Sequence, residues 1–124
     1  MGDRACVLFF DGTAVSPTVY LHWHGRAVPA RLAELKTLMH GRNHDAAYAA
    51  ARFVGICHAH IGGNLSLGVT SNRLVPADLR NPAALAALSP GNAGLVLVDT
   101  TDFTWRAVGG YLADAHHQPV QHEE

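Results

Sequence analysis

The sequence has few cysteines, few aromatic residues and almost no net charge. Its two cysteines, Cys6 and Cys57, fall in a predicted strand and a predicted helix, which is typical of buried thiols in a reducing compartment. A net charge of −1 gives no field that attracts nucleic acid or an anionic membrane. No apolar run approaches the roughly 18 residues of a membrane-spanning helix, and the start MGDRACVLFF is unlike a signal peptide. We therefore expect a cytoplasmic protein with no nucleic-acid or membrane partner.

The composition is that of a globular domain. Hydrophobic residues make up 48% of the 124 residues and charged residues 15%, which is apolar enough to form a core. At this length roughly two-thirds of the unfolded chain's surface is buried on folding, so neither disulfides nor a structural metal is required. We expect one domain over residues 1–112 and a disordered tail over 113–124, where ADAHHQPVQHEE lacks apolar periodicity. Abundant alanine, and arginine at all but one basic position, suggest a GC-rich bacterial or phage genome.

Two segments near the N-terminus predict a β-hairpin. The apolar run Arg4–Phe10 ends at Asp11-Gly12, a strong turn signal. The following segment, Thr18–His24 (TVYLHWH), alternates between two faces. We expect one face to enter the core and the other to be polar; these are Val19, Leu21 and Trp23, and Tyr20, His22 and His24. Truncation of a core residue such as Trp23 to alanine is then expected to cost about 3–5 kcal/mol.

Three further segments complete the predicted sheet. Leu65, Leu67 and Val69 alternate through a short strand, and residues 71–80 after it are loop-like. Leu95–Thr100 and Phe103–Val108 form a terminal hairpin. The sequence therefore predicts an antiparallel sheet of four to five strands.

The first of two main helices begins at Pro29, where the missing N–H of proline costs nothing. Its C-cap is Gly41. Apolar residues recur along it at helical spacing, namely Val28, Leu32, Leu35 and Met39, with Leu38 alongside.

The second main helix has Asn43 as its N-cap and runs through AAYAAARFVGICHAH to Gly62-Gly63. Its many small residues, Gly55 among them, indicate close approach to another backbone, so we expect it to be the central buried helix. A shorter helix over Ala83–Leu88 follows Asn81-Pro82. The predicted fold class is α+β, with the sheet packed against the two main helices.

The histidines of the second predicted strand form the first candidate site. Alternation places His22 and His24 on one face, about 7 Å apart, a spacing that can chelate one ion. Tyr20 adds a hydroxyl group to this face, and Arg26 supplies an anion contact just beyond it. The alternative is a plain polar strand face opposite the core.

The segment Cys57-His58-Ala59-His60 is the second candidate. On a helix Cys57 and His60 share a face while His58 points about 100° away, so the three side chains cannot bind one ion together. A buried thiol followed by histidines that suit the helix dipole is the alternative. A further alternative is that Cys57 acts as a nucleophile and that His22 or His24 is its base.

The glycine-rich loop at residues 62–68 is the third candidate. Such loops can hold phosphate groups. Here, however, the glycines follow a helix, whereas those of phosphate loops precede one. A helix C-cap is the favoured interpretation, and Asn64 is kept as a candidate ligand contact.

The stretch Val19–Gly25 (VYLHWHG) resembles a strand pattern of small uncharacterised phage and prophage proteins. In these proteins His-Trp-Asp-Gly precedes a helix that ends near a Leu-Ser-Leu-Gly-like segment. The matching positions here are His22-Trp23-His24-Gly25 and Asn64-Leu65-Ser66-Leu67-Gly68, with His24 where the pattern has Asp. The resemblance implies a small accessory protein of a mobile element, many of which bind a host component or a signalling nucleotide.

Two functional hypotheses follow. The first is a non-enzymatic binding or inhibitor protein, encoded by a phage or mobile element and acting in counter-defence, that needs no cofactor. It engages an anionic, nucleotide-like small molecule or a host protein as a homodimer. The predicted set has no catalytic or metal residue, and its ligand contacts are Tyr20, His22, His24, Arg26, His58, His60 and Asn64. The alternative is a small metal-dependent hydrolase with His22, His24 and His58 or His60 as ligands, but no carboxylate lies near either cluster.

Overall fold

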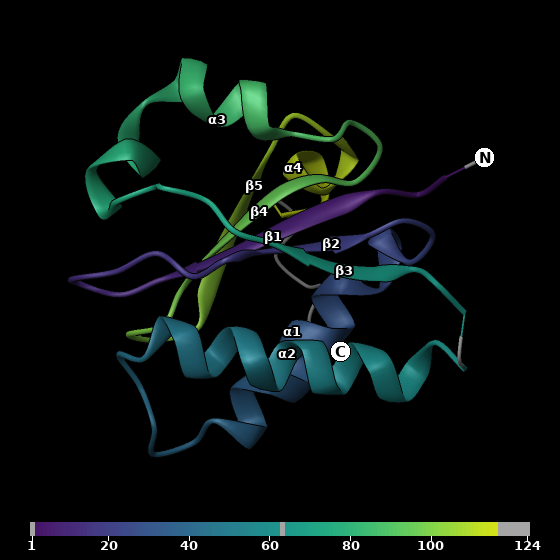
Figure 1. The fold of residues 1–124 in the computed structure, drawn as a ribbon, viewed down its shortest axis with the longest axis horizontal. Helices are drawn as coiled ribbons and strands as arrows, with labels where there is room; N and C mark the ends of the chain where they lie inside the picture. The colour runs from purple at the N-terminus through teal and green to yellow at the C-terminus, as the bar shows by residue number, and fades with distance from the viewer. Residues whose placement is uncertain (1, 63, 117–124) are drawn as a thin grey trace.

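The computed structural model describes residues 2–62 and 64–116. Along the chain, strands and helices mostly follow one another in adjacent pairs (Figure 1). In chain order they are β1 (Ala5–Phe10), β2 (Thr18–Leu21), η1 (Gly25–Ala27), α1 (Val28–Leu38), α2 (Ala46–His60), β3 (Leu67–Thr70), η2 (Pro76–Arg80), α3 (Pro82–Leu88), β4 (Gly94–Asp99), β5 (Thr104–Val108) and α4 (Tyr111–His116).

The five strands form one sheet in the order β3-β2-β1-β4-β5. Both predicted hairpins are confirmed, because β1 pairs with β2 and β4 with β5 in antiparallel fashion. The α+β class is confirmed as well, but the sheet is mixed, since the central strands β1 and β4 run parallel. The whole middle of the chain connects these two strands, so β4 can enter the sheet in the same direction as β1. Its run from Leu95 to Val98 is buried throughout, as expected of a strand covered on both faces.

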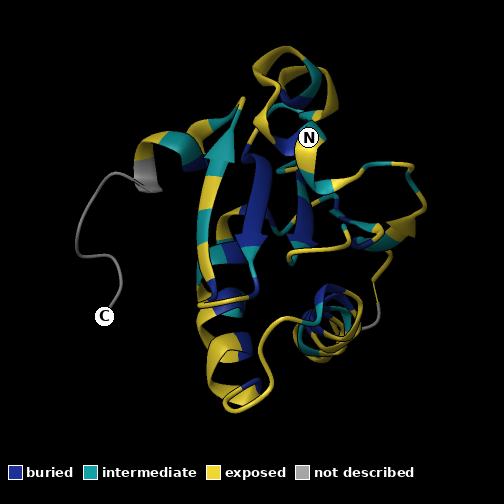
Figure 2. Ribbon diagram, turned by 90° about the vertical axis from the view of Figure 1, so that its left-hand side faces the viewer, coloured by how far each residue is buried: buried dark blue, intermediate teal, exposed yellow. Residues whose placement is uncertain are grey.

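Helices cover both faces of the sheet (Figure 1). α1 and α2 lie against one face, where the larger core contains the Phe9–Phe53 ring contact at 5.4 Å. η2 and α3 cover the other face over a smaller core formed by Leu8, Leu79, Leu85, Leu95 and Leu97. Figure 2 shows the buried central strands between helices whose outer sides are exposed. The candidate site described below lies on the α1–α2 face.

β2 is shorter than predicted and ends at Leu21. Val19 and Leu21 are buried as expected, but Trp23 is 45% exposed, so its assignment to the core is wrong. The backbone bends after His22 because Trp23 N–H donates to Ser66 Oγ (3.1 Å) and Gly25 N–H to the carbonyl of Asp3 (2.7 Å). At Gly25 a Cβ atom would lie 2.6 Å from that carbonyl oxygen, so the bend requires glycine. Strand alternation therefore cannot be extended beyond His22.

α1 lies where it was predicted, although it begins one residue earlier, at Val28, and its C-cap is Met39 rather than Gly41. Pro29 lies in its first turn, and Gly41, with a φ of +86°, follows its end. The predicted apolar stripe is buried with the exception of Leu38, which is 56% exposed.

α2 differs from its prediction in its cap and its burial. The N-cap is Asp45, whose carboxylate accepts from Tyr48 N–H at 3.0 Å, whereas Asn43 donates its amide to the Thr101 carbonyl (2.6 Å). The helix buries one face against the sheet and exposes the other, so it is not a central helix. Gly55 is exposed, and a Cβ atom added there would have no neighbouring atom within 4 Å, so no other backbone packs closely against it.

The remaining elements refine the predicted boundaries. β3 begins at Leu67, and Leu65 lies outside it with 89% of its surface exposed. The predicted loop over residues 71–80 contains the turn η2, while α3 follows its Asn81 cap as expected. α4 extends into the segment predicted as a tail and buries Leu112. Residues 117–124 of that tail lie outside the described residues.

Candidate functional site

The structure separates the three side chains that strand alternation placed on one face. Tyr20 and His22 do lie together, with the hydroxyl oxygen 2.9 Å from Nδ1, and the imidazole packs edge-on against Trp23. His24 lies instead on the side of the sheet where Leu21 is buried. The shared face was wrong for His24 because the chain leaves the sheet at the bend after His22, which ends the alternation.

Arg26 and His58 are also apart from His24. The Arg26 side chain is 82% exposed, and its Nε lies 3.4 Å from Asp3. His58 is exposed on the outer side of α2. Neither side chain lines a pocket with the other predicted ligand contacts.

Asn64 has a structural task in the loop after α2. Its amide donates to the Ile61 carbonyl (2.8 Å), and its side-chain oxygen accepts from Ser66 N–H (2.9 Å). These bonds hold Ser66 in place, and the Ser66 hydroxyl lies 2.8 Å from Nδ1 of His24. Asn64 therefore positions a neighbour of the pocket rather than lining the pocket itself.

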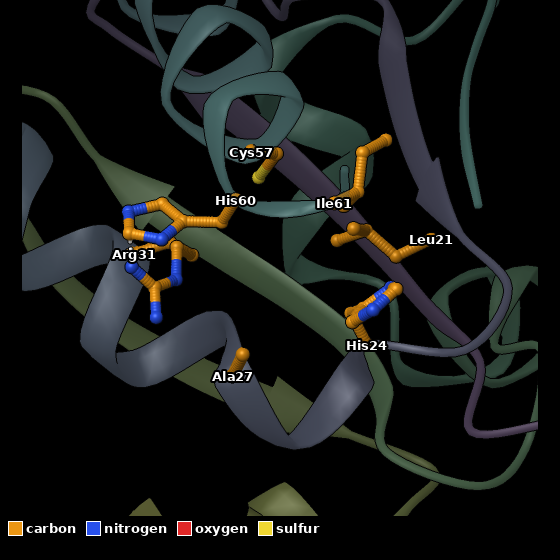
Figure 3. A pocket seen from close by; sticks show the side chains of 7 residues that line it. All are labelled: Leu21, His24, Ala27, Arg31, Cys57, His60 and Ile61. Carbon is orange, nitrogen blue, oxygen red and sulfur yellow. Dashed lines mark hydrogen bonds between the residues drawn. The ribbon is translucent and has the colours of Figure 1, made fainter. Parts of the chain in front are cut away.

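Two of the predicted residues, His24 and His60, do meet at one place. They line a half-open pocket of about 130 Å³ between α1, α2 and the end of β2, which we call the Arg31 pocket. Its walls are formed by Leu21, His24, Ala27, Arg31, Cys57, His60 and Ile61. Figure 3 shows the side chains of Arg31 and His60 at one end and His24 at the other, with apolar side chains between them.

Arg31 was not among the predicted site residues, yet it is the strongest polar feature of the pocket. Its side chain is only 20% exposed. One terminal nitrogen contacts the Glu34 carboxylate and lies 2.6 Å from Nε2 of His60. Its Nε is buried and has no hydrogen-bond partner among the described residues. A buried donor left in this state costs about 1–3 kcal/mol.

Glu34 and His60 hold the guanidinium group in place. Glu34 oxygens lie 3.1 Å and 3.2 Å from Nε2 of His60. Nε2 of His60 can accept from Arg31 in one tautomer or donate to Glu34 in the other, but it cannot do both at the same time. Glu34 lines a separate shallow groove with Leu38 and does not line the Arg31 pocket. Its charge therefore acts on Arg31 from outside the pocket.

Cys57 lies in the wall of the pocket as a neutral thiol. It is 1% exposed, and burial raises its pKa to about 12. At neutral pH a thiol of this kind is not a nucleophile, so the predicted alternative with His24 as its base gains no support. As predicted, Cys57 and His60 share one face of α2 while His58 does not. Within residues 2–62 and 64–116, no group of three or more His, Cys, Asp or Glu side chains could hold a metal ion.

No helix in the described part of the chain combines the length and apolar character needed to cross a membrane. Comparison with known proteins finds no matching family model, and no curated protein or solved structure is significantly similar to the chain. The resemblance to phage proteins therefore stays a prediction.

Proposed function

We propose that this chain is a non-enzymatic binding protein that holds a small organic anion in the Arg31 pocket. One observation carries the proposal: the buried Nε–H of Arg31 has no partner among the described residues, and its side chain lines an open cavity. A guanidinium group stays charged at all physiological pH values and donates without accepting. An anion in the pocket would be attracted by this permanent charge, and a small shift of the side chain would bring the Nε donor within its reach.

The size of the pocket restricts the ligand. An apolar protein cavity of about 150 Å³ holds one benzene molecule, so about 130 Å³ encloses roughly five or six heavy atoms, and because the pocket is half-open a slightly longer ligand can project from it. Pockets for drug-sized ligands begin at about 300 Å³. These volumes favour a short carboxylate over the nucleotide-like ligand expected from the sequence.

The chemistry of the walls favours binding over catalysis. The Cys57 thiol is protonated, and Glu34 approaches Arg31 from outside the pocket. Among the described residues no three His, Cys, Asp or Glu side chains come together, as the metal-dependent hydrolase would require. Action as an inhibitor in a phage context stays a prediction that this proposal does not require.

Titration of the protein with butyrate, followed by NMR chemical shifts and by calorimetry, tests the proposal. Binding should shift the resonances of Ile61, His60 and the Arg31 side chain. Arg31→Lys keeps the charge but removes the Nε donor, so affinity should fall about tenfold or more, as expected when a hydrogen bond to a charged group is lost. Arg52→Gln, which changes an exposed arginine of α2 outside the pocket, is the matched control and should bind as the wild type does.

Two results would contradict the proposal. One is the absence of any shift at the pocket at butyrate concentrations that leave the fold intact. The other is equal loss of affinity in Arg31→Lys and Arg52→Gln, which would show that the loss is not specific to the pocket. Melting temperatures of all three proteins show whether each variant remains folded.

A further inference from the structure

Ser66 is placed to determine which nitrogen of His24 carries the proton. The Ser66 hydroxyl oxygen accepts from Trp23 N–H at 3.1 Å and lies 2.8 Å from Nδ1 of His24. Ser66 is 1% exposed, so its own hydroxyl proton needs a partner within the protein. His24 Nδ1 is the acceptor at hydrogen-bond distance, and a hydroxyl that donates to it leaves the proton of a neutral imidazole on Nε2.

His24 therefore offers a donor to the pocket. Its ring lines the cavity, and its Nε2 has no hydrogen-bond partner among the described residues. The guanidinium group of Arg31, whose buried Nε–H has no partner among the described residues, lies at the opposite end of the same cavity (Figure 3). Between these two donors the wall is apolar, with Leu21 and Ile61 on one side and Ala27 on the other.

A ligand that matches this order of groups has a hydrogen-bond acceptor at each end and a short apolar middle. We infer that the Arg31 pocket selects short carboxylates whose far end carries a second acceptor, a carboxylate or an amide or keto oxygen, which binds His24. This inference rests on the proposed function and narrows its ligand class. The Arg31 end binds the charged group, because only that end carries a permanent positive charge.

The test compares butyrate, succinate and succinamate at mildly alkaline pH. Succinate and succinamate carry a second acceptor where butyrate has a methyl group, and succinamate has the same net charge as butyrate. Both should bind the wild-type protein about five- to tenfold more tightly than butyrate, as one added hydrogen bond provides. His24→Phe keeps an aromatic ring without the donor, so the ratio of succinamate to butyrate affinity should fall to about one. His40→Phe changes an exposed histidine after α1 and should leave the ratio at its wild-type value.

The proton position is measured independently of binding. Nitrogen NMR of the imidazole rings should find His24 with its proton on Nε2, and Ser66→Ala should weaken this preference. A proton on Nδ1 of His24 would overturn the inference. Equal affinities for all three acids, with the loss in Arg31→Lys retained, would refute the second acceptor and leave the proposed function standing. Absence of binding for every acid would refute both.

Discussion

Asp11 joins the turn after β1 to the beginning of α2. One carboxylate oxygen accepts from the backbone N–H groups of Thr13 and Ala14, each at 2.8 Å, and from the Thr13 hydroxyl at 3.1 Å. The other oxygen accepts from Ala46 N–H at 2.9 Å, in the first turn of the helix, where a negative charge also suits the helix dipole. We predict that Asp11→Asn destabilises the protein although it preserves the shape of the side chain.

The size of the stability loss in Asp11→Asn depends on which hydrogen bonds the new side-chain amide can keep. If its oxygen retains the three turn contacts, its NH₂ group faces the N–H of Ala46, and the bond between turn and helix is lost. Loss of one hydrogen bond to a charged group costs about 1.5–3 kcal/mol. For a domain of this size that corresponds to a decrease in Tm of about 3–5 °C for each kcal/mol. The reverse orientation of the amide would lose three contacts and cost at least as much.

The pH dependence gives the prediction a second test. Burial opposes the charge of Asp11, but the hydrogen bonds from Ala46, Thr13 and Ala14 outweigh it and lower the carboxyl pKa below its usual 3.8. A lowered folded-state pKa stabilises the protein above the unfolded-state pKa, and this contribution is lost as pH falls through the folded value. The difference between wild type and Asp11→Asn should therefore be constant above about pH 5 and shrink below pH 3.8.

Chemical denaturation across pH measures both effects. Asp102→Asn is the matched control, because Asp102 accepts from the N–H and hydroxyl of Thr104 in the same turn geometry and has no bond to a helix. Its amide oxygen can keep both contacts, so its stability should change little. Equal effects of the two substitutions, or a difference for Asp11→Asn that persists undiminished at pH 2.5, would refute the reasoning about Ala46.

Four further predictions concern the core, the thiol, the assembly and metal content. Trp23→Ala should cost about 1 kcal/mol, because the ring is half-exposed, against about 3–5 kcal/mol for Phe53→Ala, and denaturation curves rank the two. Cys57 should resist alkylation at pH 8 in the native state, because its pKa is raised to about 12; rapid labelling seen by mass spectrometry would contradict this. Since β3 forms one edge of the sheet, we expect light scattering to give twice the 13.2 kDa chain mass, and a monomer at all micromolar concentrations would oppose it. Elemental analysis of untagged protein should find no stoichiometric transition metal, and one zinc ion per chain would revive the hydrolase hypothesis.

Local signals predicted the elements that depend on neighbouring residues. α1 was predicted from Pro29, Gly41 and an apolar period of helical spacing, and all of these act within a few turns of chain. The two hairpins were predicted because a short connection makes antiparallel pairing the simplest outcome. The N-cap of α2 was placed two residues early, since Asn43 and Asp45 have similar capping preferences and only the folded chain selects between them.

The errors lie where residues far apart in the chain decide the outcome. The parallel pairing of β1 with β4 joins segments about ninety positions apart, for which the sequence contains no local signal. The bend that exposes Trp23 and turns His24 toward the helices depends on Ser66, which lies on another segment. Alternation through residue 24 was the natural interpretation of TVYLHWH, and it failed at the first position where such a distant partner intervened.

The helical pattern of the sequence makes Arg31 a candidate site residue but does not distinguish it from Lys36. At 100° per residue, Arg31 lies about 40° from Leu35, at the border of the buried stripe of α1, whereas Glu34 is about 100° from Leu35. A charged residue at such a border is a candidate site residue, because its stem packs on apolar neighbours while its head reaches their rim. Lys36, however, lies about 40° from Leu32 on the opposite border and is exposed. The two positions are equivalent in the sequence, and α2 distinguishes them by placing His60 and Cys57 beside Arg31 alone.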